Sequence, residues 1–135
     1  MKRFIVYALA CLLWTGAAQA TGTTYDCKFK DNDPHNWIPP RVVVSMNEAN
    51  GTAEAYDGLI DHLFEWPISV EFKRRSAKSV QWGWTMDNIP GKGNKTFRAS
   101  FKVTVNQNTK KATIKILVHG FANNAIGHGN CVIMK

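Results

Sequence analysis

The chain has 135 residues, and 17 Lys and Arg stand against 10 Asp and Glu, which gives a formal net charge of +7 at pH 7. The length allows a real, though small, hydrophobic core and excludes two domains of ordinary size. The basic balance permits attraction to anionic surfaces but does not require it.

The first twenty residues are predicted to be an export signal. Lys2 and Arg3 form a positive start, 4–14 is apolar and uncharged, and 18–20 reads Ala-Gln-Ala, a cleavage site of the A-x-A type. The apolar run is far shorter than the roughly 20 residues of a membrane-spanning helix. We therefore expect an exported protein, periplasmic or secreted and not membrane-spanning, with one β domain over 21–135. Loss of the two basic residues lowers the net charge from +7 to +5.

Three cysteines bear on the compartment. Cys11 lies in the signal, and using it as a lipoprotein anchor would place Ala8 where leucine is expected. Cys27 and Cys131 remain after cleavage, and an even pair in an oxidising compartment predicts a disulfide. Closing a loop of about 104 residues would stabilise the fold by roughly 4–5 kcal/mol in the chain-entropy model.

Alternation of apolar and polar residues with period two dominates the rest of the chain and predicts β-strands. Short polar turns join the runs into hairpins. The expected fold is all-β, with about eight antiparallel strands in an up-and-down barrel, or alternatively in a two-sheet sandwich. The expected strands are 24–30, 41–47, 52–57, 68–75, 79–86, 95–106, 111–118 and 130–135.

One segment, DGLIDHLFEWP over 57–67, departs from this alternation. Its apolar residues recur at a spacing of four, Asp57 is suited to an N-cap, and Pro67 would stop a helix. The pattern predicts a helix of about two turns that could close one end of the barrel. A ninth, irregular strand is the alternative.

The tryptophans have two interpretations. Trp82 and Trp84 share the inward face of their strand, and small alanines on the other inner faces would let them fill the core. Alternatively, they form the aromatic wall of a ligand pocket near a barrel mouth. Trp37 and Trp66 lie in loop-like segments beside prolines and are the better candidates for the rim of such a pocket.

Basic residues suggest a second kind of binding surface. Three of them lie at the end of the expected strand 68–75 and in the turn that follows it. The other three lie on one outer face of the hairpin formed by 95–106 and 111–118. Together they could meet an anionic envelope polymer or an acidic protein, whereas nucleic acid is not expected for an exported chain. The plainer interpretation is a charged face that keeps the sheet soluble. The six residues are Arg74, Arg75, Lys78, Arg98, Lys102 and Lys115.

Motifs of catalysis and of metal binding are lacking in the sequence. No serine lies in a G-x-S-x-G pattern, and the four histidines have no zinc-like spacing. We therefore expect no catalytic residues, no metal and no cofactor. No sequence motif supports the alternative that the protein is a hydrolase.

Tyr25-x-Cys27 near the start and Cys131 near the end carry a resemblance. The chain resembles small exported β-proteins of Gram-negative bacteria, and its architecture is similar to that of the periplasmic C-type lysozyme inhibitors, which are eight-stranded barrels. The inhibitors' functional loops carry S-G-x-x-Y and Y-x-x-x-T-K-G patterns, and this sequence has neither. The resemblance therefore implies a fold but carries over no inhibitory residue.

The expected function is that of an exported, non-catalytic binding or envelope-accessory protein, holding a small apolar ligand in an aromatic-lined pocket. The alternative is a surface binder of an anionic envelope component, or a protein inhibitor, acting through the basic patch.

Overall fold

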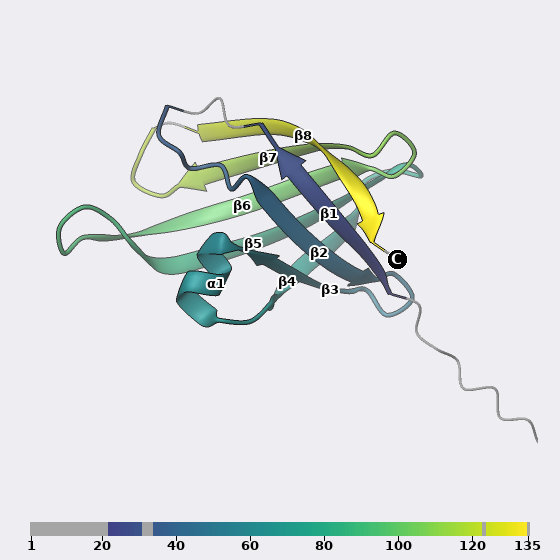
Figure 1. Cartoon of the computed structure of the whole chain (residues 1–135), viewed down its shortest axis with the longest axis horizontal. Coiled ribbons are helices and arrows are strands. Elements are labelled where there is room, and N and C mark those ends of the chain that lie inside the picture. Colours follow the sequence, from purple (N-terminus) through teal and green to yellow (C-terminus); the bar gives the residue numbers. More distant parts are fainter. Residues whose placement is uncertain (1–21, 31–33, 123, 135) are drawn as a thin grey trace, which may run out of the picture.

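Eight antiparallel strands close into a barrel in the computed structural model, which describes residues 22–30, 34–122 and 124–134. Each strand pairs with the next, and β1 pairs with β8, so the sheet has no free edge (Figure 1). This confirms the up-and-down barrel and not the sandwich. The predicted signal peptide over 1–20 lies outside the described residues. The strands are β1 (Thr23–Phe29), β2 (Arg41–Asn47), β3 (Thr52–Asp57), β4 (Ile68–Arg74), β5 (Ser79–Pro90), β6 (Thr96–Asn106), β7 (Lys111–Val118) and β8 (Asn124–Met134).

The two ends of the barrel differ. At one end, here called the α1 end, lie the connections β1–β2, β5–β6 and β7–β8 together with the helix α1 (Gly58–Phe64), which joins β3 to β4. At the other, here called the turn end, lie the short turns β2–β3, β4–β5 and β6–β7 (Figure 1). The connections at the α1 end are longer than those at the turn end.

The predicted helix is confirmed. Asp57 is its N-cap, and the Oδ1 atom of Asp57 accepts a hydrogen bond from the backbone N–H of Ile60 at 2.8 Å. Ile60 is fully buried, which fixes the helix against the barrel. Glu65 ends the helix in the left-handed conformation at φ 66°, two residues before Pro67. No helix in the described part of the chain has both the length and the apolar character needed to cross a membrane.

β5 is longer than predicted because of a β-bulge. Met86 pairs with Ala99 and Ile89 pairs with Phe97, so β5 carries one more residue than β6 in this interval. The extra residue, Asn88, has a φ of 56°. Strict alternation would turn Ile89 outward, whereas the bulge returns it to the barrel interior, where it is 4% exposed.

β8 is also longer than predicted, and its early half is built on glycines. Gly127 lies against Ile38 and Ile114, whose side chains would be 3.0 Å from an added Cβ. At Gly129 an added Cβ would lie 1.9 Å from the carbonyl oxygen of Lys28. These glycines allow the close approach of β1 and of the 34–40 segment, and they remove the large apolar side chains by which a strand is recognised.

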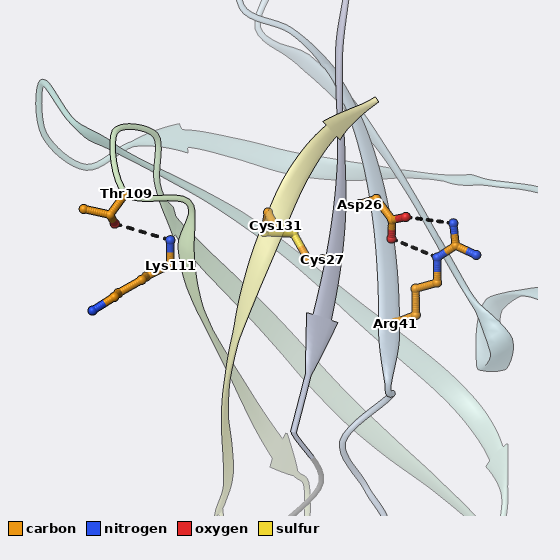
Figure 2. Close-up of a disulfide and its surroundings, with 6 residues drawn as sticks. All are labelled: Asp26, Cys27, Arg41, Thr109, Lys111 and Cys131. Atoms are coloured by element: carbon orange, nitrogen blue, oxygen red, sulfur yellow. Dashed lines mark hydrogen bonds and ion pairs between the residues drawn. A yellow bond between two sulfur atoms is a disulfide. The ribbon is translucent and has the colours of Figure 1, made fainter. Parts of the chain in front are cut away.

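The disulfide joins the first and last strands. Cys27 and Cys131 are directly opposite each other on β1 and β8, and their sulfur atoms are bonded (Figure 2). The bond spans a sequence separation of 104 residues. It therefore covalently closes the one seam of the barrel that is formed by strands distant in the sequence.

An ion pair lies beside this seam. Arg41 donates two hydrogen bonds to the Asp26 carboxylate, at 2.8 and 2.9 Å (Figure 2). These hydrogen bonds, with the charges of Arg41 and Lys28, lower the pKa of Asp26 below its usual value although burial alone would raise it. The pair links β1 to β2 on the outer face of the barrel.

The lowered pKa of Asp26 predicts how this pair depends on pH. A carboxyl group whose pKa is lower in the folded state stabilises the fold above its unfolded pKa of about 3.9, and that contribution is lost as the pH falls through the folded pKa. We expect Asp26→Asn to lower the melting temperature at neutral pH and to have progressively less effect below about pH 4. Thermal melts of both proteins across this range measure the difference. An effect that does not change with pH would contradict the assignment.

Candidate functional site

A cavity of about 280 Å³ opens at the α1 end of the barrel. Its wall combines the 36–40 segment, the start of α1 and the inward faces of β5, β6 and β7. Most of these side chains are apolar. The lining residues are Asn36, Trp37, Ile38, Pro39, Pro40, Asp57, Gly58, Leu59, Ile89, Phe97, Ala99, Phe101, Ile116 and Val118.

The floor of the cavity is aromatic and rests on a filled core. Phe101 lines the cavity and stacks on Trp84, with ring centroids 5.4 Å apart and planes 6° from parallel. Toward the turn end, Trp82 pairs with Val103, and both residues are 0% exposed. The barrel interior is therefore packed behind Phe101 and hollow in front of it.

The rim of the cavity is held by ring contacts. Trp37 stacks on His35 at a centroid distance of 5.0 Å and meets Phe121 edge-on at 6.3 Å. Ile38, the next residue, is 3% exposed and packs into the core. The 34–40 segment is thus anchored by Ile38 and places the Trp37 ring at the opening.

Asp57 gives the cavity its charge. The residue is 4% exposed, and burial raises the pKa of its carboxyl group, although backbone N–H groups of Ile60 and Leu59 act against this rise. Its Oδ1 atom caps α1. Its Oδ2 atom is buried and has no hydrogen-bond partner among the described residues. An acceptor left in this condition costs about 1–3 kcal/mol, which a donor that reached it would offset.

The four tryptophans singled out in the sequence lie in three different environments. Trp37 lines the cavity. Trp66 follows α1 and is 64% exposed. Trp82 and Trp84 are core residues, and their indole Nε1 atoms have no hydrogen-bond partner among the described residues. The structure thus brings Trp37 to the cavity and places Trp84 one ring behind its wall.

The six basic residues lie at the β4–β5 turn and on the neighbouring strands β6 and β7. Arg74 is bound to Glu48 and to Gln107 at the turn end. Arg98 pairs with Asp87 at 3.1 Å. Two of the six are therefore neutralised locally, and an anion-binding surface stays a prediction of the sequence.

The remaining four basic residues fall into two groups. Lys102 and Lys115 are exposed and directly opposite each other on β6 and β7. Arg75 and Lys78 lie in the β4–β5 turn. The outer wall therefore has a local excess of positive charge at Lys102 and Lys115. Like charges directly opposite each other in a sheet are mildly destabilising.

Histidines on the outer wall bind neighbouring hydroxyl groups. His119 Nε2 lies 2.9 Å from Ser100 Oγ, and His128 Nδ1 lies 3.4 Å from Thr113 Oγ1. Ser100 also contacts Thr85 Oγ1 at 2.9 Å. Within the described ranges, no three His, Cys, Asp or Glu side chains gather in a way that could hold a metal ion.

Comparisons with protein-family models, with curated proteins and with solved structures found no match to this chain. The fold and the site therefore have to be interpreted from their own geometry. They define an eight-stranded closed barrel with a lined cavity at one mouth.

Sequence reasoning missed Asp57 as a cavity residue. It identified this residue only as a helix cap, but Asp57 continues the inward alternation of Ala53 and Ala55 along β3. A charged residue on an otherwise apolar inner face is the sequence feature that could have identified Asp57 as a cavity residue. Phe97 and Phe101 follow the inward alternation of the strand 95–106, and nothing in their spacing distinguishes a cavity wall from a filled core.

Proposed function

We propose that this protein is an exported, non-catalytic binding protein that holds a small, mainly apolar molecule in the mouth of its barrel. The observation that carries the proposal is the cavity of about 280 Å³ with its apolar and aromatic wall. The disulfide between Cys27 and Cys131 supports export to an oxidising compartment.

The size of the cavity limits the ligand. Small-molecule pockets commonly measure about 300–1,000 Å³, and an apolar cavity of about 150 Å³ is enough to bind benzene. A cavity of about 280 Å³ therefore suits a molecule of one or two rings or a short branched chain.

The position of the cavity also supports binding. Eight-stranded barrels have interiors that side chains can just fill or that hold one small ligand. Here Trp84 packs on Phe101 and Trp82 fills the interior behind them, whereas small Ala99 faces the cavity. A ligand that fills an apolar cavity beside a well-packed core gains packing contacts with the cavity wall.

The neutral two-ring probe 1-ethylnaphthalene tests this proposal. We expect the tryptophan emission to change on binding, because Trp37 lies at the rim of the cavity. In Ala99→Leu the added atoms occupy the cavity, so the affinity should fall at least about tenfold. Fluorescence titration of both proteins measures the change.

Ala112→Leu is the matched control. Ala112 is also buried on an inner face, but it lies outside the lining of the cavity. The same enlargement there should lower the free energy of unfolding by about 1–3 kcal/mol through overpacking and leave the affinity of the folded protein unchanged. If the wild-type protein shows no binding, or if Ala99→Leu binds as well as the wild type, the proposal is refuted.

A further inference from the structure

We propose that the ligand of this cavity is an organic ammonium ion, in which a ring-sized apolar body carries one protonated amine that pairs with Asp57. This inference rests on the proposed function and specifies its ligand. The carrying observation is a buried carboxyl group, Asp57, that belongs to the lining of an otherwise apolar and aromatic cavity and has one oxygen without a hydrogen-bond partner among the described residues.

The ionisable charge in the described lining of the cavity is entirely acidic. Among the described residues that line it, Asp57 alone is ionisable, and Asn36 is the other polar side chain. The pleat of β3 places Asp57 on the same inward face as Ala53 and Ala55. A cationic ligand would therefore meet one acid and no competing base within the lining.

The polar groups on the other side of Asp57 already have partners. Asp57 also borders a groove with Arg41, Tyr56 and Asp61. Arg41 is held by Asp26 through two hydrogen bonds, and the Tyr56 hydroxyl donates to Asp61. Neither Arg41 nor Tyr56 therefore satisfies the free Oδ2 atom of Asp57.

The walls of the cavity suit a cation as well as an apolar body. Trp37, Phe97 and Phe101 contribute aromatic rings to the lining. A cation over such a ring is attracted to its negative face, by about 0.5–1 kcal/mol when exposed and by more when desolvated. Aromatic rings around a single carboxylate thus match an ammonium group attached to a hydrocarbon, whereas an anion of the same size would be repelled by Asp57.

Burial of Asp57 makes the binding dependent on pH. Burial raises the pKa of Asp57 by disfavouring its charged form, whereas a nearby ammonium ion favours the carboxylate. The affinity for the cation should therefore decrease as the pH falls, and the decrease should begin above the ordinary aspartate value of about 3.9. Among the described residues, the other titratable groups near this site are Arg41, Tyr56 and Asp61 across the outer groove, and His35 stacked on Trp37.

Four naphthalene derivatives of similar shape test the inference: 1-naphthylmethylamine, 1-naphthalenemethanol, 1-ethylnaphthalene and 1-naphthaleneacetate. Calorimetric titration at neutral pH should rank the amine first, the alcohol second, the hydrocarbon third and the anion last. A hydrogen bond to a charged group contributes about 1.5–3 kcal/mol, so the amine should bind at least about tenfold more tightly than the hydrocarbon.

Asp57→Asn removes the charge and keeps the helix cap, because asparagine is an equally good N-cap residue. In this variant the amine should lose its tenfold advantage, and the hydrocarbon should bind as before. Asp61→Asn removes the same charge one helical turn away, outside the lining, so the amine should keep its advantage. Thermal melts check that both variants are folded.

The outcomes separate this inference from the proposed function. Binding of all four compounds without preference for the amine, or a preference that survives Asp57→Asn, overturns the ammonium ligand and leaves the cavity as an apolar binding site. Absence of binding by every compound overturns both. A preference lost in Asp57→Asn and retained in Asp61→Asn establishes the inference.

Discussion

We expect the double substitution Cys27→Ala/Cys131→Ala to lower the free energy of unfolding by up to about 4–5 kcal/mol. The cross-link spans a sequence separation of 104 residues, so its loss frees a long loop in the unfolded chain. Because 1 kcal/mol shifts the melting temperature of a domain of this size by roughly 4–8 °C, the expected fall is on the order of 20 °C. Thermal melts of the purified, oxidised wild type and of the variant measure it.

Reduction of the wild-type protein provides the control for this effect. Both cysteines are buried, at 0% and 2% exposure, so alanine removes some packing as well as the bond. Reduced wild type keeps the sulfur atoms and loses only the cross-link, and it should show most of the same fall. Equal melting temperatures for the oxidised and reduced proteins would show that the bond contributes nothing to stability.

We expect Trp82→Ala to lower the free energy of unfolding by about 3–5 kcal/mol. Trp82 has no exposed surface and packs against Tyr25 with a centroid distance of 5.4 Å. Its indole N–H has no partner among the described residues, so the loss comes from packing and not from a hydrogen bond. Urea denaturation, with the midpoint and the slope analysed together, measures the change.

Two further variants calibrate the Trp82 effect. Trp66→Ala removes the same side chain where it is 64% exposed, and the change should stay within about 0.5 kcal/mol. Trp82→Phe keeps a ring in the core and removes the unpaired N–H, so its loss should be clearly smaller than that of Trp82→Ala. If Trp66→Ala were as damaging as Trp82→Ala, the assignment of Trp82 to the core would be wrong.

Strand order and helix were predictable because their signals are local. Alternation in β6 and β7 continues without interruption from Thr96 to Asn106 and from Lys111 to Val118. The N-cap at Asp57 and the spacing of four in α1 are likewise read from neighbouring residues. Since consecutive strands pair throughout, hairpin order led directly to the barrel.

The parts that escaped prediction depend on contacts between distant segments. The β5 bulge changes the face on which Ile89 lies, so alternation counted from Met86 gives the wrong side. The early half of β8 carries Gly127 and Gly129 because Ile38 and the Lys28 backbone approach closely there. These approaches exist only after the barrel has closed, and no local pattern records them.

The candidate site could be predicted only in outline. Trp37 was expected at a pocket rim and lines the cavity. The combined volume of side chains from several strands determines which part of the interior is filled and which part is hollow. The alternation of apolar and polar residues carries no information about that volume. Asp57 was not recognised as the acidic residue of the cavity, because its capping role already explained its presence at the start of α1.

The pairing of β1 with β8 also determines the orientation of the cavity when the protein is immobilised. Thr24 pairs with Met134, so the described chain enters and leaves the barrel at the turn end (Figure 1). The cavity opens at the α1 end. A tag or a solid support attached on the C-terminal side of β8 would therefore lie at the end of the barrel opposite the cavity, and the cavity of the immobilised protein would face the solvent.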